Sequence, residues 1–395
     1  RSVTFHLERP DPELPAKLAL TMSYPVPAAT PFEDQGLDAL PATGPYMVDE
    51  VTMDGLELVR NPEFEEWSGA AQPDGFVDAI SWRFNEDPGQ AYERLTTEEL
   101  DLMIDAPSGD DLAALRSASP DQVVQSSSPT FELFVGFDVQ KAPFDDVRVR
   151  QAVNYAIDRD RVVELLGGPA TQRPTCQILP PTFPGYLPYC PYTQEPKAGV
   201  WSAPDMDRAR ELVHAAGVAG TPVRVAVNAD GLPSGAVDTM TYVTEILNEL
   251  GLRAELDIVR SIDAYFSSIN PPQAGGTPAG APRHPHVYLT GWVSDYLGAG
   301  NMIEPQFHCG DLGFANTGGY CDGALDTRIE DALVLYTTEP GAASRAWTSI
   351  DHDLVDEAVQ APLTNPVTTY VVSERTGNVQ LNPQWGLLLS LLWVR

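Results

Sequence analysis

The chain has few basic residues, few cysteines and no long apolar run. It has 24 lysine and arginine residues against 56 aspartate and glutamate residues, a formal net charge of −32 over 395 residues. Such a charge repels nucleic acid and anionic membranes, so we expect neither as a partner. The longest apolar stretch, 387–394, is broken by Ser390 and falls short of the ~20 residues of a membrane-spanning helix. We therefore expect no transmembrane helix.

The motifs of common hydrolases are also missing. No Gly-x-Ser-x-Gly sequence is present, and Ser234 lies in a Pro-Ser-Gly turn. No pair of carboxylates stands out among so many acidic residues, so the spacing does not indicate a two-carboxylate glycosidase. We expect neither an enzyme nor a cofactor, with a secreted hydrolase as the alternative.

The four cysteines fall into two local pairs, Cys176 with Cys190 and Cys309 with Cys321. Neither pair has the short ligand spacing of a zinc site. Two disulfides in an oxidising compartment fit this pattern, and unrelated buried thiols are the alternative. Disulfides require export, whereas the sequence opens without a signal peptide. We therefore predict an extracytoplasmic protein whose biological N-terminus is not the one shown.

Three histidines, His284, His286 and His308, lie in one region. A single His-x-His in a loop is a weak signal, because packed or solvated histidines are more common than ligands. We expect no metal site, although a metal chelate could itself be a ligand.

The pattern of apolar residues predicts two α/β layers. Residues 3–7 alternate as a strand does, and Asp54-Gly55 between two apolar runs predicts a hairpin. Residues 43–140 mix strands and helices. Helices and strands alternate from 205 to 291, which predicts a second, largely parallel α/β domain.

A buried strand at Val287-Tyr288-Leu289 leads into Trp292 and Asp295. An aromatic wall beside a fixed carboxylate suits a small molecule that carries an ammonium group. A core tryptophan and a loop-capping aspartate are the alternatives. Their position just past the end of a strand favours a binding crevice.

Four ordered stretches carry a family resemblance. They are residues 44–62, 137–159 with the run PFDDVRVRQAVNYAIDR, 180–186, and 291–296 with GWVSDY. Together they resemble the peptide- and nickel-type solute-binding receptors of ABC importers, the bacterial extracellular solute-binding protein family 5.

The resemblance implies the two-lobed periplasmic-binding-protein type II (Venus-flytrap) α/β fold, with an incomplete first lobe. Residues 1–42 would be the remnant of an N-terminal subdomain and connector, 43–140 with 374–395 the first lobe, and 141–373 the second. The implied function is a monomeric receptor that captures a peptide or related amino-bearing solute between its lobes and delivers it to ABC permease subunits. It would reach the membrane only through a lipid anchor in the missing N-terminus.

The same resemblance assigns residues. In peptide-binding members the aspartate of the Gly-Trp-x-x-Asp segment pairs with the α-ammonium of the peptide. Asp295 matches this position, Trp292 matches the adjacent aromatic, and Tyr296 follows them in the expected ligand-binding set. Dipeptide-binding members carry a disulfide just after this segment, as Cys309 and Cys321 could.

One departure leaves the solute open. The chain has no arginine around 231–233, where dipeptide binders place one for the peptide carboxylate. A free dipeptide is therefore less expected than a longer peptide, an amide or another amino-bearing solute. A receptor for a metal chelate or a sugar is the alternative.

Overall fold

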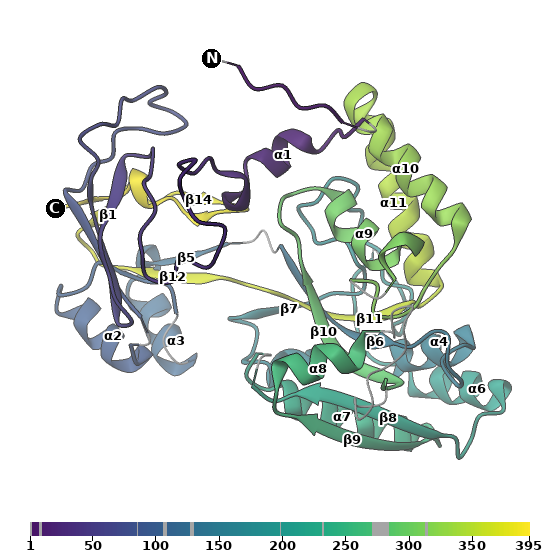
Figure 1. Ribbon diagram of the computed structural model, residues 1–395. Coiled ribbons are helices and arrows are strands. Elements are labelled where there is room, and N and C mark those ends of the chain that lie inside the picture. The colour runs from purple at the N-terminus through teal and green to yellow at the C-terminus, as the bar shows by residue number, and fades with distance from the viewer. Residues whose placement is uncertain are drawn as a thin grey trace. The chain divides into compact units, whose positions relative to one another are not determined.

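The protein divides into two compact units in the computed structural model (Figure 1). Unit 1 contains Arg1–Lys17 and Ser128–Val367, and unit 2 contains Leu18–Ser127 and Thr368–Arg395. The structure describes residues 2–7, 10–84, 86–105, 109–126, 130–197, 199–230, 233–270, 284–312 and 315–395. The sequence predicts lobe boundaries at 140/141 and 373/374, and the unit boundaries in the structure lie at 127/128 and 367/368.

A six-stranded sheet forms the middle of unit 1, in the order β7-β11-β6-β10-β8-β9. Its strands are β6 (Phe131–Phe137), β7 (Gln172–Pro174), β8 (Pro222–Asn228), β9 (Arg253–Val259), β10 (Val287–Val293) and β11 (Gln360–Pro366). Only β10, β8 and β9 run parallel, whereas β6 is antiparallel to both β10 and β11. The prediction of a largely parallel sheet is right for the half in which helices connect the strands, because parallel neighbours need such crossovers.

Besides α1 (Leu14–Leu18), which ends one residue past the boundary of unit 1, eight helices belong to unit 1 in the described residues. They are α4 (Val147–Ala156), α5 (Arg159–Leu165), α6 (Met206–Ala216), α7 (Ala236–Glu249), α8 (Ile262–Ile269), α9 (Ala299–Phe307), α10 (Gly323–Thr338) and α11 (Pro340–Asp356). Asp146 caps α4 and Asp158 caps α5 through side-chain bonds to main-chain N–H groups. The caps place α4 and α5 against β11.

The two largest apolar cores among the described residues lie in unit 1. Leu133, Val135 and Phe137 of β6 pack with the buried faces of α4, α6 and α7. A second core joins α9, α10 and α11, the helices grouped near one another in Figure 1, with Trp347 fully enclosed at its centre. Burial of side chains this large contributes roughly 1.5–3 kcal/mol each.

Unit 2 contains two small sheets of three strands. One has the order β1-β2-β3, with β1 (Tyr46–Val51), β2 (Gly55–Arg60) and β3 (Ala79–Arg83). The other has the order β4-β12-β5, with β4 (Leu102–Met103), β5 (Val123–Gln125) and β12 (Thr369–Val372).

The remaining elements of unit 2 are short. They are α2 (Pro88–Thr96), α3 (Gly109–Ala118), η1 (Thr21–Ser23), η2 (Pro120–Gln122), η4 (Leu389–Leu391) and the strand pairs β13 (Thr376–Gly377) with β16 (Trp393–Val394) and β14 (Leu381–Asn382) with β15 (Gly386–Leu387).

The predicted Asp54-Gly55 hairpin is confirmed, because Val51 pairs with Leu56 across that turn. The strand predicted at residues 3–7 is wrong, because these residues have no strand partner and are exposed.

A groove of about 610 Å³ in unit 2 follows two strand edges. Five consecutive residues of β3 and the residues around β4 line it, together with α2 and the C-terminal segment. Both β3 and β4 are terminal strands of their sheets within the described residues. Apolar side chains such as Trp82, Leu102 and Leu392 share the lining of this groove with charged residues such as Arg83, Glu86 and Asp101.

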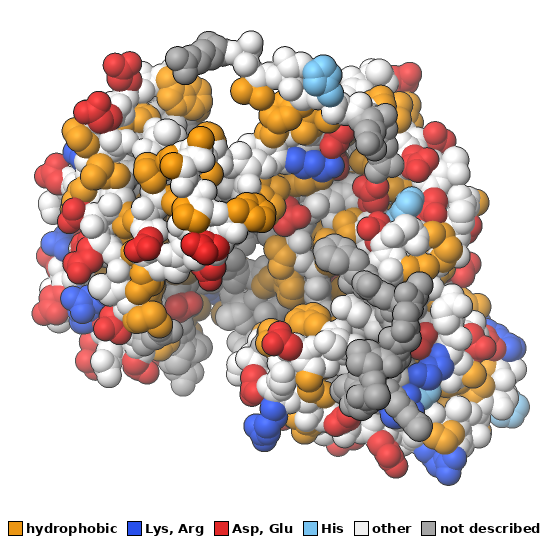
Figure 2. All heavy atoms as spheres, viewed as in Figure 1, with side chains coloured by type: hydrophobic (Ala, Val, Ile, Leu, Met, Phe, Trp, Pro, Cys, Tyr) orange, Lys and Arg blue, Asp and Glu red, His pale blue; other side chains and the backbone are white. Residues whose placement is uncertain are grey.

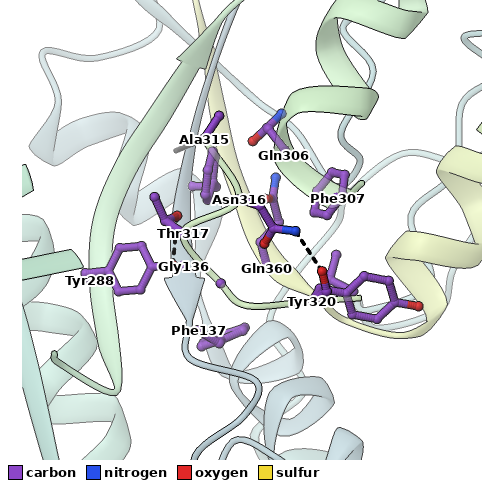
Figure 3. A pocket seen from close by; sticks show the side chains of 13 residues that line it. Gly136, Phe137, Tyr288, Gln306, Phe307, Ala315, Asn316, Thr317, Tyr320 and Gln360 are labelled. Carbon is purple, nitrogen blue, oxygen red and sulfur yellow. Dashed lines mark hydrogen bonds between the residues drawn. The ribbon is translucent and has the colours of Figure 1, made fainter. Parts of the chain in front are cut away.

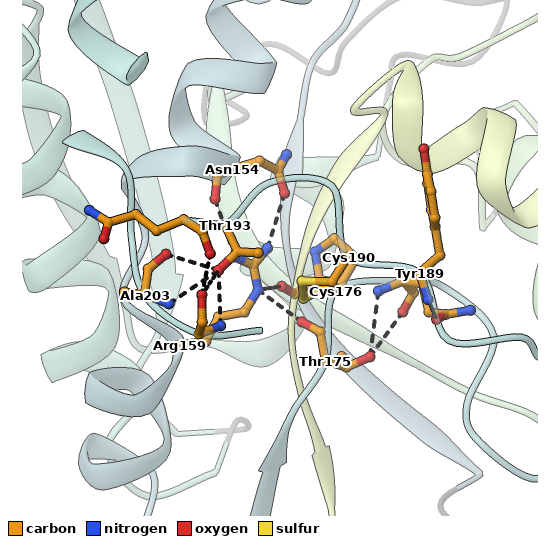
Figure 4. Close-up of a disulfide and its surroundings, with 12 residues drawn as sticks. Asn154, Arg159, Thr175, Cys176, Tyr189, Cys190, Thr193 and Ala203 are labelled. Atoms are coloured by element: carbon orange, nitrogen blue, oxygen red, sulfur yellow. Dashed lines mark hydrogen bonds between the residues drawn. A yellow bond between two sulfur atoms is a disulfide. The ribbon is translucent and has the colours of Figure 1, made fainter. Parts of the chain in front are cut away.

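Both predicted disulfides are present, and all four cysteines are paired. Cys176–Cys190 closes a loop within the connection between β7 and α6, and Cys309–Cys321 closes the loop between α9 and α10. Arg159 lies beside the first disulfide, with its guanidinium directed at Thr175 and Asn154 (Figure 4).

Replacing Cys176 and Cys190 together by alanine should lower the free energy of unfolding by about 3 kcal/mol. The disulfide closes a loop with a sequence separation of 14, and its loss lets the unfolded chain explore more conformations. Urea denaturation of the oxidised proteins measures the difference. Reduction of both disulfides in the unsubstituted protein should lower the free energy of unfolding further. An unchanged urea midpoint in the double variant would contradict the prediction.

The surface is acidic over a wide area. Figure 2 shows aspartate and glutamate side chains spread over the visible face of both units rather than gathered at one place. In the part of the chain that the structure describes, no helix has the length and apolar character needed to cross a membrane.

Candidate functional site

The candidate site is the loop between β10 and α9. The first four residues of β10 are buried, and Val293 at its end is exposed. Ser294 then donates its main-chain N–H to Thr130, which extends the contact with the strand beside β10. The loop therefore starts from a central strand of the sheet, and a rigid scaffold of this kind holds functional side chains in place.

Trp292 and Asp295 are brought together by a shared partner, Asn301. The indole Nε1 of Trp292 donates to the main-chain oxygen of Asn301 at 2.8 Å. The main-chain N–H of Asp295 donates to Asn301 Oδ1 at 2.7 Å, and Asn301 Nδ2 donates to Asp295 Oδ2 at 3.3 Å. Trp292 is half-buried against the α9–α11 core, whereas Asp295 is exposed. The loop thus presents a carboxylate at the surface beside a fixed indole.

Tyr296 points away from this surface. It is only 4% exposed, and its hydroxyl donates to Glu13 Oε2 at 2.7 Å. Burial raises the pKa of the Tyr296 hydroxyl, and the negative charge of Glu13 adds to this effect. Tyr296 remains in the predicted ligand-binding set, but in this structure it holds the loop against the N-terminal segment.

Glu13 is a buried acidic residue beside the candidate loop, and the sequence gives no sign of this position. Burial raises the pKa of its carboxyl group. A Cβ atom at Gly298 would lie 2.5 Å from Glu13 Oε1, and one at Gly300 would lie 2.9 Å from Glu13 Oε2. The two glycines therefore let this carboxyl group approach the start of α9, where the N–H groups of a helix favour a negative charge. In the sequence, the spacing of Gly298 and Gly300 indicates that some group comes close to the start of α9. It does not indicate that this group is Glu13.

Two further acids lie deep in unit 1. Glu132 of β6 is 0% exposed and accepts both of its hydrogen bonds from Gln360 Nε2, at 3.0 and 3.1 Å. Asp351 of α11 accepts from Gln177 Nε2 at 2.6 Å and from the main-chain N–H groups of Ile178 and Leu179. Burial raises the pKa of Glu132 well above its ordinary value, with a contribution from the charge of Asp351.

The buried carboxyl group of Asp351 should make stability depend on pH. Burial raises its pKa from 3.8 to about 6, so between these values the folded state binds more protons than the unfolded state. The free energy of unfolding therefore increases as the pH falls through this window. Relative to Asp351→Asn, the unsubstituted protein should gain on the order of 1 kcal/mol for each pH unit below about pH 6.

Urea denaturation of both proteins between about pH 7 and pH 5 measures this gain. His286 acts in the opposite direction, because burial lowers its pKa to about 4 and its protonation opposes folding. His286 is present in both proteins, so its effect cancels from the difference. Glu132 adds to the difference in the same direction, because the charge of Asp351 helps to raise its pKa. A difference that does not change with pH would contradict the assignment.

A small cavity lies under the loop that Cys309–Cys321 closes (Figure 3). Its walls come from β6, β10, β11, α9 and residues 315–320. Tyr288 donates its hydroxyl hydrogen to Thr317 at 2.9 Å, and Asn316 Nδ2 donates to the main-chain oxygen of Tyr320 at 2.7 Å. The cavity volume of about 10 Å³ is the size of one water molecule. It is too small for a solute.

The three histidines considered as metal ligands have other partners. Nδ1 of His286 accepts from the main-chain N–H of Arg224 at 2.9 Å, His284 lies 3.5 Å from Asp138, and His308 lies near Asp311 and Asp326. Across the described ranges, no group of three or more histidine, cysteine or acidic side chains is arranged to hold a metal ion. Residues 231 and 232, in the stretch where an arginine was sought, lie outside the described residues.

The family model for the bacterial extracellular solute-binding proteins, family 5 (middle region), matches residues 1–314, and the chain belongs to this family. The family consists of substrate-binding receptors and not of enzymes, as the sequence predicts. Its members are periplasmic or located at the cell surface.

Curated relatives cover most of the chain. The glutathione-binding protein GsiB of Escherichia coli (strain K12) is 24% identical over 340 residues, which is 85% of this chain and 60% of GsiB. GsiB of Salmonella choleraesuis (strain SC-B67) is 24% identical over 343 residues, with the same shares. The chain thus spans about 60% of the length of the curated relatives that it matches.

Solved structures confirm the fold. The clavulanic acid biosynthesis oligopeptide binding protein 2 matches 99% of this chain and 70% of its own, with a TM-score of 0.81 and 24% identity. DppA from Helicobacter pylori in complex with the peptide STSA matches 89% of this chain and 63% of its own, with a TM-score of 0.63 and 17% identity. The predicted two-lobed α/β fold of periplasmic binding proteins is therefore confirmed.

Proposed function

We propose that the protein captures a peptide, or a related solute with a free amino group, and delivers it to an ABC permease. The observation that carries this proposal is the exposed Asp295 carboxylate beside the indole of Trp292, on a loop tied to a central strand. A carboxylate and an aromatic face are the two groups that stabilise an ammonium ion as water is excluded. The loop follows the carboxyl end of β10, where α/β sheets bind ligands.

The relatives support the same class of solute. The titles of several solved structures name peptides, among them a Haemophilus influenzae OppA complex with the nine-residue peptide RPPGFSPFR. The curated relatives are named for glutathione, a tripeptide that also carries a free amino group. We propose that this protein acts as a monomer, because the receptor role needs one ligand site and one docking surface for a permease.

Native mass spectrometry with peptide libraries tests the proposal. We expect the protein to retain peptides from a random tripeptide-to-hexapeptide library with free N-termini, and to retain the N-acetylated library at least about tenfold more weakly. Glutathione serves as a single defined probe. Equal retention of both libraries would contradict recognition of the amino group. Retention of a sugar or a metal chelate instead of peptides would identify a receptor of another kind.

A further inference from the structure

Asn301 is the point at which the bonds of the candidate loop converge. It lies in the first turn of α9, and its side chain reaches back six residues to Asp295. Its Oδ1 accepts from the main-chain N–H of Asp295 at 2.7 Å and from Ser294 Oγ at 2.9 Å. Its Nδ2 donates to Asp295 Oδ2, and its main-chain oxygen accepts from Trp292 Nε1. One residue therefore holds both groups that the ligand is proposed to meet.

The direction of the Asn301 amide follows from its partners. A main-chain N–H can only donate, so the amide oxygen must face the N–H of Asp295. The NH₂ group is then turned toward the Asp295 carboxylate, as observed. A carboxylate has about four acceptor positions, so this bond is compatible with an ammonium partner on the same group. The arrangement holds the carboxylate in one orientation before any ligand arrives.

We infer that Asn301 is a positioning residue for ligand recognition, which acts through Asp295 rather than by touching the ligand. The inference rests on the proposed function. Holding the carboxylate in its binding orientation removes part of the ordering cost of binding, and this improves affinity without a new contact. The indole of Trp292 is held through the main chain of Asn301, so a side-chain substitution leaves that bond in place. Substitution of Asn301 by alanine therefore removes its side-chain bonds to Asp295 and Ser294 only.

A double-mutant cycle between Asn301→Ala and Asp295→Asn tests the inference. Residues in one hydrogen-bond network show coupled effects, whereas independent residues have additive ones. Against the free-amino peptide library, we expect N301A to weaken retention about tenfold. In the D295N background the same substitution should weaken retention less than about twofold, because the side chain that Asn301 holds no longer carries the charge that pairs with the ammonium group.

Asn248 offers a matched control. Its side chain also spans six residues, with Oδ1 accepting from the N–H of Ala254 at 2.9 Å and Nδ2 donating to the oxygen of Ala254 at 3.1 Å. Asn248→Ala removes a similar loop-closing amide far along the chain from Asp295, at the end of α7. It should leave peptide retention within about twofold of the unsubstituted protein, while its effect on urea denaturation resembles that of N301A.

The outcomes separate the inference from the proposed function. If the unsubstituted protein retains no peptide from the free-amino library, the proposed function is wrong and the inference falls with it. If it retains peptides but N301A equals the unsubstituted protein, or weakens retention equally in the D295N background, only the inference is wrong. Should N301A unfold at the assay temperature, Asn301→Ser keeps a hydroxyl near the Asp295 N–H, and the same cycle is measured with it.

Discussion

Asp295→Asn should weaken the binding of a peptide with a free N-terminus by about 2–5 kcal/mol. The substitution keeps the size of the side chain and its bond from Asn301, but it removes the negative charge. Once the ligand excludes water, an ammonium group without a paired carboxylate carries the full penalty of desolvation. Isothermal titration calorimetry with a peptide that the unsubstituted protein retains measures the loss.

Asp257→Asn is the control for this prediction. Asp257 is an exposed acid on β9 of the same unit, so its substitution changes the net charge equally without touching the loop. On a chain with a formal charge of −32, loss of one such charge should change affinity by less than about 0.5 kcal/mol. Equal affinities for the D295N and D257N proteins would exclude Asp295 as the partner of the amino group.

Arg159→Met should lower the free energy of unfolding by about 3 kcal/mol. Arg159 is 0% exposed, and four hydrogen bonds from its guanidinium go to neutral oxygens of Asn154, Thr175 and Pro362. Methionine fills similar space but leaves three buried main-chain carbonyls without this donor, at a cost of about 1–3 kcal/mol each. Burial also lowers the pKa of Arg159 to about 10, so removing the charge offsets part of that cost.

Arg161→Met is the matched control for Arg159. Arg161 lies two residues further along α5, is exposed, and contacts Glu164 at 3.1 Å. Surface pairs of this kind contribute little, so we expect a change below about 0.5 kcal/mol. Urea denaturation of the two variants compares the same substitution in a buried and an exposed position. A similar loss in both would show that the carbonyl oxygens around Arg159 find other donors.

Local signals in the sequence predicted the local parts of the structure. The Asp54-Gly55 hairpin, the strand before Trp292 and both disulfides depend on residues close together in the chain. Residue types and their spacing indicate interactions between residues that are this close in the chain. The same holds for Trp292 and Asp295, which lie on one short loop.

Contacts between distant residues were the part that sequence patterns did not predict. Glu13 meets Tyr296 across 283 positions, and no spacing rule connects them. The antiparallel placement of β6 between β10 and β11 likewise depends on which strands meet in the sheet, while the apolar pattern of β6 fits either direction. The sequence does not indicate a role for Asn301 in the candidate loop, because an asparagine in a first helical turn has many structural roles.

The position of β11 in the sheet bears on the order in which the protein can assemble. β11 is the last strand of the six-stranded sheet along the chain, yet it lies between β7 and β6 and not at an edge. During synthesis, β6 can pair with β10 on one side, but its other edge stays open until residues 360–366 have left the ribosome. An unpaired strand edge invites pairing with other chains. This edge of β6 is thus open to misassembly from the synthesis of β6 until that of β11, and a factor that shields strand edges would act in this interval.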